Sequence, residues 1–86
     1  MEFLHTRKYL GPGQSVEVDC DTQCNVMLTD DHNFTRFKSR STHTYFGGHR
    51  KFFPTVLTPP HAGWWNITID LDGRAATIRH SITIRG

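Results

Sequence analysis

Residues 59–71 read PPHAGWWNITIDL, a turn signal that leads directly into the most strongly alternating segment of the chain. From Trp64 onward the side chains alternate with the period of two that is typical of a β-strand with one face on a core. One face carries Trp65, Ile67, Ile69 and Leu71, and the other carries Trp64, Asn66, Thr68 and Asp70. We therefore expect this segment to be the central strand of the fold, with the first face buried.

The length and composition predict one small domain, spanning residues 1–86. A chain of 86 residues buries roughly 60–65% of its unfolded surface, which is enough for one core. The mean hydropathy is -0.50, and the longest apolar run is far shorter than the roughly 20 residues of a membrane-spanning helix. The first ten residues lack the apolar centre of a secretory signal, so we expect a cytoplasmic location and no membrane partner.

Charges are unevenly placed along the chain. The first third is acidic and the middle is basic, although the net charge of +2 is too small to indicate a nucleic-acid binder by itself. The basic residues of the middle are Arg36, Lys38, Arg40, Arg50 and Lys51. They are either a solvated face or a site for an anion or a partner.

Turn signals divide the rest of the chain into short segments. Alternation predicts strands at residues 1–10, 15–20, 24–28, 42–46, 49–53, 54–58, 64–71 and 76–85, with a helical turn at 33–38 capped by Asn33. The loop 21–23 predicts a hairpin between the second and third strands, and Asp72-Gly73 predicts one between the last two. The pattern indicates an all-β, antiparallel, jelly-roll-like β-sandwich or a partly open barrel of about seven or eight strands.

Cys20 and Cys24 flank the loop 21–23, and both are expected to point inward. A disulfide between them is geometrically conceivable. The alternative is a pair of reduced, buried thiols that act as small core residues, which the absence of an export signal favours. A zinc site would need more ligands than this spacing offers.

Several pieces of the sequence resemble one family when they are taken in order. They are Met1-Glu2-Phe3-Leu4-His5, the glycine-rich turn before Val16-Glu17-Val18, Asn25-Val26-Met27-Leu28 with Asn33-Phe34, Tyr45-Phe46-Gly47-Gly48, and the run from Gly63 to Leu71. In this order they resemble the bacterial "domain of unknown function 1883" family. The resemblance implies a compact all-β domain, alone or attached to modules such as TIR domains of defence or signalling proteins, and it implies no established activity.

The histidines raise the possibility of a metal site. His43 and His49 bracket the Gly47-Gly48 turn, and His61 precedes Trp64, so three imidazoles with an open position would suit zinc. No metalloprotease-type spacing is present, and we keep this site as an alternative only. His80 is expected to be a core histidine of the last strand.

No enzyme or cofactor signature stands out. The sequence has no paired carboxylates placed for acid–base chemistry, no glycine-rich phosphate loop and no nucleotide fingerprint. A cysteine with a histidine is the only conceivable nucleophile pair, and burial would raise the pKa of the thiol. We therefore predict a non-enzymatic protein without a cofactor.

A recognition module is the favoured function. Exposed aromatic and basic side chains are common anchors of protein contacts. The predicted binding residues are Tyr45, Phe46, His49, Arg50, Lys51, His61 and Trp64. A protein partner or self-association is favoured over a small ligand. Single-stranded nucleic acid, bound through Phe46, Phe52 and Phe53 with the neighbouring basic residues, is a further alternative.

Overall fold

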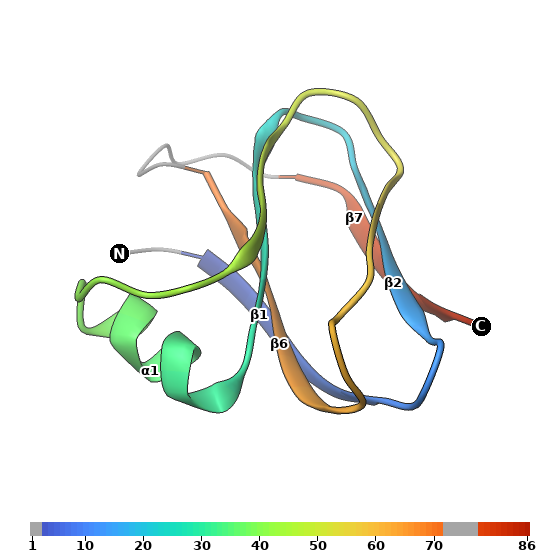
Figure 1. Ribbon diagram of the computed structural model, residues 1–86. Helices are drawn as coiled ribbons and strands as arrows, with labels where there is room; N and C mark the ends of the chain where they lie inside the picture. The colour runs from blue at the N-terminus through green and yellow to red at the C-terminus, as the bar shows by residue number, and fades with distance from the viewer. Residues whose placement is uncertain (1–2, 72–77) are drawn as a thin grey trace.

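The computed structural model describes residues 3–71 and 78–86, which form two antiparallel sheets and one helix (Figure 1). The strands are β1 (Phe3–Leu10), β2 (Ser15–Cys20), β3 (Cys24–Thr29), β4 (Phe46–Arg50), β5 (Thr55–Leu57), β6 (Gly63–Asp70) and β7 (His80–Arg85), and the helix is α1 (Asp31–Lys38). One sheet has the order β1-β6-β3-β4, and the other has the order β5-β2-β7. The predicted all-β sandwich is therefore confirmed.

Strand β6 lies inside the larger sheet, as the alternation in residues 64–71 predicted. It pairs with β1 along its whole length and with β3 on its other side. Trp65, Ile67 and Ile69 are buried between the two sheets, and Leu71 packs against the same cluster while partly exposed. Because side chains of both sheets surround these residues, β6 is the centre of the core.

The opposite face of β6 differs from the prediction. Asn66 and Thr68 are each only 1% exposed, although a one-sided strand would present them to solvent. The reason is α1, which lies on the side of β1 and β6 that faces away from β2 and β7 (Figure 1). The helix adds a third layer and covers part of this outer face.

The N-terminal end of α1 is capped by Asp30, not by Asn33. The Asp30 carboxylate accepts a hydrogen bond of 2.8 Å from the backbone N–H of Asn33. Phe34 and Phe37 share the buried face of the helix, as their spacing predicted, and pack with Met27 and Phe3. Two phenylalanines thus attach the helix to the sheet.

Both predicted hairpins are wrong in their pairing. Strands β2 and β3 belong to different sheets, because the connection 21–23 passes from one sheet to the other instead of turning back within one sheet. Strand β7 pairs with β2 and not with β6, and its first residue, His80, is exposed. The Asp72-Gly73 turn lies outside the described residues. Alternation has the same appearance in either arrangement, because a strand turns the same set of alternate side chains toward the core whichever sheet it belongs to.

Strand β4 runs through the two glycines that were expected to end a strand. It starts at Phe46, and Gly47 lies opposite Met27 of β3 with a φ of 111°. A Cβ at Gly47 would lie 2.2 Å from the carbonyl oxygen of Val26, so only glycine permits this approach. The strand predicted at 49–53 ends at Arg50, whereas the short strand predicted after Pro54 is confirmed as β5.

None of the described helices combines the length and the apolar character needed to cross a membrane.

Candidate functional site

Two exposed aromatic side chains lie side by side on the outer face of the larger sheet. Trp64 of β6 pairs with Tyr9 of β1, and their rings make an edge contact with centroids 5.6 Å apart. Trp64 is 51% exposed and Tyr9 is 55% exposed. The Arg7 guanidinium lies 4.3 Å from the centre of the Trp64 ring. We call Arg7, Tyr9 and Trp64 the Trp64 patch.

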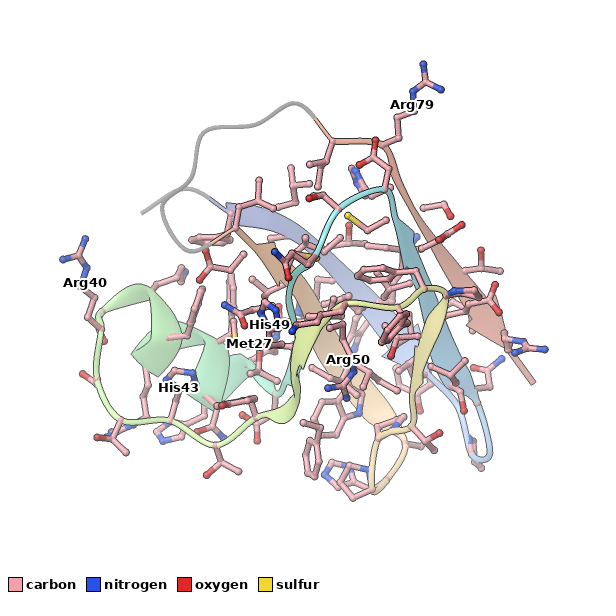
Figure 2. The ribbon with its side chains drawn as sticks, turned by 90° about the horizontal axis from the view of Figure 1, so that it is seen from above. Met27, Arg40, His43, His49, Arg50 and Arg79 are labelled. Atoms are coloured by element: carbon pink, nitrogen blue, oxygen red, sulfur yellow. The ribbon has the colours of Figure 1, made fainter. Side chains whose placement is uncertain are left out.

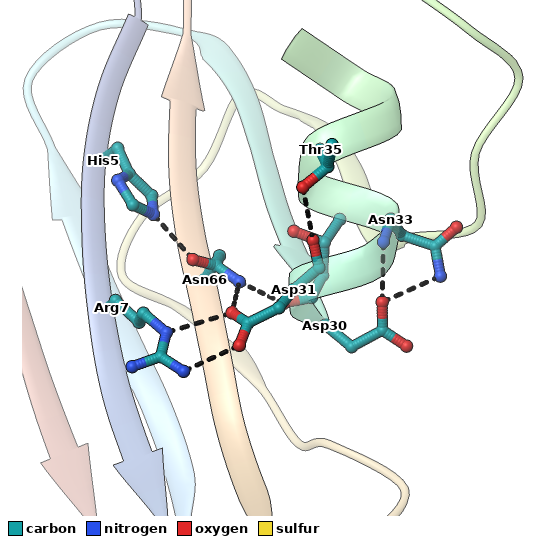
Figure 3. A network of polar contacts seen from close by, with 8 residues as sticks. His5, Arg7, Asp30, Asp31, Asn33, Thr35 and Asn66 are labelled. Atoms are coloured by element: carbon teal, nitrogen blue, oxygen red, sulfur yellow. Dashed lines mark hydrogen bonds and ion pairs between the residues drawn. The ribbon is translucent and has the colours of Figure 1, made fainter. Parts of the chain in front are cut away.

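Asp31, at the start of α1, fixes the orientation of Arg7 (Figure 3). Its two carboxylate oxygens accept hydrogen bonds from Arg7 Nε at 3.0 Å and Nη2 at 2.6 Å. These bonds, together with one from Asn66, lower the pKa of Asp31 from 3.8 to about 2. The same hydrogen bonds raise the pKa of Arg7.

Asn66 connects this ion pair to the interior of the protein. Its side-chain amide donates to Asp31 Oδ1 at 2.8 Å and to the backbone carbonyl of Thr29 at 3.3 Å. The amide oxygen therefore accepts, and His5 Nε2 donates to it at 2.8 Å. The His5 ring stacks on Phe34 with centroids 4.0 Å apart. The network joins β1, β6, β3 and α1 next to the Trp64 patch, on the same face of the sheet.

A second candidate site is a pocket of about 390 Å³ between α1 and β4, which we call the α1–β4 pocket. Figure 2 shows Met27, His43 and His49 in this region beside the helix. The pocket is lined by Asn25, Met27, Phe37, His43, Tyr45, Gly48, His49 and Asp70. The His43 ring contacts Phe37 and Tyr45, with centroids 5.5 Å and 5.4 Å away. Three predicted residues, His43, Tyr45 and His49, thus meet here.

The remaining predicted residues lie elsewhere. Phe46 and His61 both contact the buried Trp65 ring, with centroids 6.1 Å and 5.1 Å away, and Trp65 Nε1 donates to the His61 carbonyl. Arg50 points away from the α1–β4 pocket and donates to Thr55 Oγ1, which joins β4 to β5. Lys51 is exposed. The predicted binding residues therefore do not form one continuous surface.

The three histidines of the metal alternative are divided as well. His43 and His49 line the α1–β4 pocket, whereas His61 lines a different pocket between the loops 11–14 and 58–62. Across residues 3–71 and 78–86, no group of three or more His, Cys, Asp or Glu side chains is placed to hold a metal ion.

The three phenylalanines of the nucleic-acid alternative also differ in their surroundings. Phe46 contacts Trp65, and Phe53 packs against the core cluster. Phe52 is 87% exposed. The described side chains do not form one platform on which successive bases could stack.

Sequence reasoning missed Arg7 and Tyr9. Both follow the parity of Phe3 and His5 along the first strand, and this parity was visible in the sequence. What the sequence could not supply is the β1–β6 register, which places Tyr9 beside Trp64 and Arg7 beside Asn66. With the β1–β6 register known, the patch could have been identified from the parity of the first strand.

Comparison with known proteins gives one match. A family model described as "Domain of unknown function (DUF1883)" matches residues 1–85. No curated protein and no solved structure matches the chain. The family match covers nearly the whole length and agrees with the resemblance noted in the sequence. The chain therefore belongs to the DUF1883 family.

Proposed function

We propose that this protein is a non-enzymatic recognition module that binds a protein partner, or a second copy of itself, through the Trp64 patch. The observation that carries the proposal is the joint exposure of Trp64 and Tyr9 beside an oriented arginine. Trp, Tyr and Arg are the side chains that most often dominate the binding energy of protein interfaces. Here all three come from the paired strands β1 and β6.

The patch is also pre-organised. Arg7 is held by two hydrogen bonds to Asp31, and Asp31 is held by the buried Asn66. Side chains that are already ordered lose less conformational entropy on binding, so more of the contact energy appears as affinity. This arrangement supports recognition better than a set of freely rotating surface side chains would.

The proposed setting is the bacterial cytoplasm, with a role in defence or signalling. The resemblance to domains found beside TIR modules motivates the role. A fusion partner or gene neighbour of known function would test this setting directly.

Affinity capture with quantitative mass spectrometry tests the proposal, using the domain as bait and light scattering to record its oligomeric state. Trp64→Ala and Arg7→Ala should lose the partner or the self-association of the wild type. Phe52→Ala is the matched control, because it removes a more exposed ring from the loop after β4 and should retain binding.

Circular dichroism must show that the variants are folded. A Trp64→Ala protein that captures the same partners as the wild type would contradict the proposal. A wild-type domain that stays monomeric and enriches no partner would contradict it as well.

A second candidate function is the binding of a small ligand in the α1–β4 pocket. His43 Nδ1 donates to the Ser41 carbonyl at 3.0 Å, which in the neutral ring leaves Nε2 as an acceptor. This buried atom has no hydrogen-bond partner among the described residues. A ligand-observed NMR screen of small hydrogen-bond donors should give hits that Tyr45→Ala loses and Phe52→Ala retains. The absence of such hits would contradict ligand binding in the α1–β4 pocket.

A further inference from the structure

Cys20 and Cys24 form a close pair at the point where the chain crosses from one sheet to the other. Cys20 is the last residue of β2, and Cys24 is the first residue of β3. Their side chains are 8% and 1% exposed and belong to the main core cluster. The Cys24 thiol donates to the Cys20 sulfur with the two sulfur atoms 3.9 Å apart. No disulfide joins them.

The two sulfur atoms are already close to bonding distance. A disulfide has a sulfur–sulfur distance of about 2.05 Å, so the atoms need to approach by roughly 2 Å. Rotation of the two side chains about their Cα–Cβ bonds moves the sulfur atoms over such distances. The loop 21–23 between them has only three residues, which keeps the thiols together in the folded protein.

Of the two cysteines, Cys20 is the one that lines pockets at the surface. Cys20 lines a pocket of about 300 Å³ with Arg79 and His80, and a second pocket of about 350 Å³ with Lys51 and Phe52. Cys24 lines neither pocket. The two residues therefore differ in surroundings: Cys20 borders both pockets and is 8% exposed, whereas Cys24 is 1% exposed.

We propose that Cys20 and Cys24 are a reversible oxidation site that forms an intrachain disulfide on exposure to a peroxide. In the first step the Cys20 thiol takes one oxygen atom from the peroxide and becomes a sulfenic acid. With hydrogen peroxide as the oxidant, the O–O bond breaks and the other oxygen atom is released as water. In the second step the Cys24 sulfur attacks the Cys20 sulfur, the S–S bond forms, and a second water leaves. A dithiol reductant restores both thiols by exchange.

The bond would tie the end of β2 to the start of β3 and thus connect the two sheets covalently at one end of the core. A cross-link restricts the unfolded chain more than the folded one, although a short loop limits the gain. We expect the melting temperature of the oxidised protein to rise by about 5–10 °C. This inference does not depend on the proposed binding function.

The test is peroxide treatment of the full chain, followed by alkylation under denaturing conditions and intact mass spectrometry. The untreated protein should accept two alkyl groups. The treated protein should accept none and should be lighter than the dithiol form by about 2 Da, and dithiothreitol should reverse both changes. Thermal unfolding of the same samples should show the higher melting temperature.

Two variants separate the roles of the cysteines. In Cys24→Ala, peroxide should leave a sulfenic acid on Cys20 that dimedone traps. In Cys20→Ala, the buried Cys24 should remain alkylatable after the same exposure. Retention of both thiols in the treated wild-type protein would overturn the proposal. Addition of oxygen without the expected loss of about 2 Da would also overturn it. So would a disulfide-linked dimer of two chains. The wild-type measurement decides the matter even if a variant does not fold.

Discussion

Asp31 is the residue that connects the helix, the central strand and the exposed patch. Its carboxylate accepts from Arg7 and from Asn66, although the Arg7 and Asp31 side chains are 43% and 55% exposed. Exposed ion pairs contribute little to stability because water and salt screen them. The two parallel hydrogen bonds do fix the plane of the Arg7 guanidinium, so the pair acts mainly on geometry.

Replacing Asp31 by Asn should therefore lower the free energy of unfolding by only about 1 kcal/mol, most of it from weaker hydrogen bonds to Asn66 and Arg7. Urea denaturation of Asp31→Asn, Arg7→Ala and the double variant gives the measurement. The two changes should not be additive, because each removes the same interaction. Additive effects would show that the ion pair is not energetically coupled.

The same carboxylate predicts a pH dependence. The folded-state pKa of Asp31 is about 2 and its ordinary value is 3.8, so the unfolded state binds the proton more tightly. The contribution of Asp31 to stability is complete above about pH 4 and is lost as the pH falls toward 2. Urea midpoints recorded across this range should fall less steeply for Asp31→Asn than for the wild type. Equal slopes in the two proteins would contradict the assignment.

At the scale of the element, α1 depends on its cap. The Asp30 carboxylate accepts from the backbone and the side chain of Asn33, and Asn33 Oδ1 accepts from the backbone N–H of Thr44. Asp30→Ala should cost about 1 kcal/mol of unfolding free energy, whereas Asp30→Asn should cost much less. Hydrogen exchange at Phe34 and Phe37 should accelerate in the alanine variant first. Unchanged exchange there would show that tertiary packing alone holds the helix.

Strand β4 depends on a glycine. Gly47→Ala should cost several kcal/mol, because the new Cβ would meet the Val26 carbonyl at 2.2 Å in a backbone region that alanine disfavours. Gly13→Ala is the matched control: its φ is also positive, at 76°, and nothing lies within 4 Å of the added Cβ. It should cost about 1 kcal/mol. Denaturant unfolding of both variants measures the difference, and similar costs would argue against the close β3–β4 approach.

The individual strands were more predictable than their partners. Alternation identified the inward residues of β6 correctly, because side-chain period is a local property. It could not assign β2 and β3 to different sheets, since the partner of a strand depends on contacts far away in the sequence. The burial of Asn66 was also invisible, because it depends on the placement of α1 and not on the composition of β6.

For the whole molecule, side chains in the centre of the larger sheet are more deeply buried than side chains at the edge of the smaller sheet. Ile67 of β6 is fully buried between the sheets, whereas Ile84 of the edge strand β7 is partly exposed. Ile67→Ala should cost about 2–5 kcal/mol and Ile84→Ala about 1–2 kcal/mol. A domain of this size has little stability in reserve, so the first variant should be close to unfolding at 37 °C. Equal costs, measured by urea denaturation, would contradict the assignment of β6 as the centre.

The candidate site was predictable only in part. Trp64 was identified because an exposed aromatic on a polar strand face stands out in the sequence. The Trp64 patch as a whole required the β1–β6 register, and the α1–β4 pocket required the position of the helix. Functional surfaces that combine several elements depend on long-range geometry, which local patterns do not contain.

The first and last strands lie at sheet edges: β1 borders the larger sheet and β7 borders the smaller one. They also belong to opposite layers of the sandwich (Figure 1). A linker or neighbouring domain joined before β1 or after β7 would therefore continue from an outer strand, and no interior pairing would have to open to admit it. Neighbouring domains fused at the two ends would therefore attach next to different sheets, on opposite sides of the sandwich.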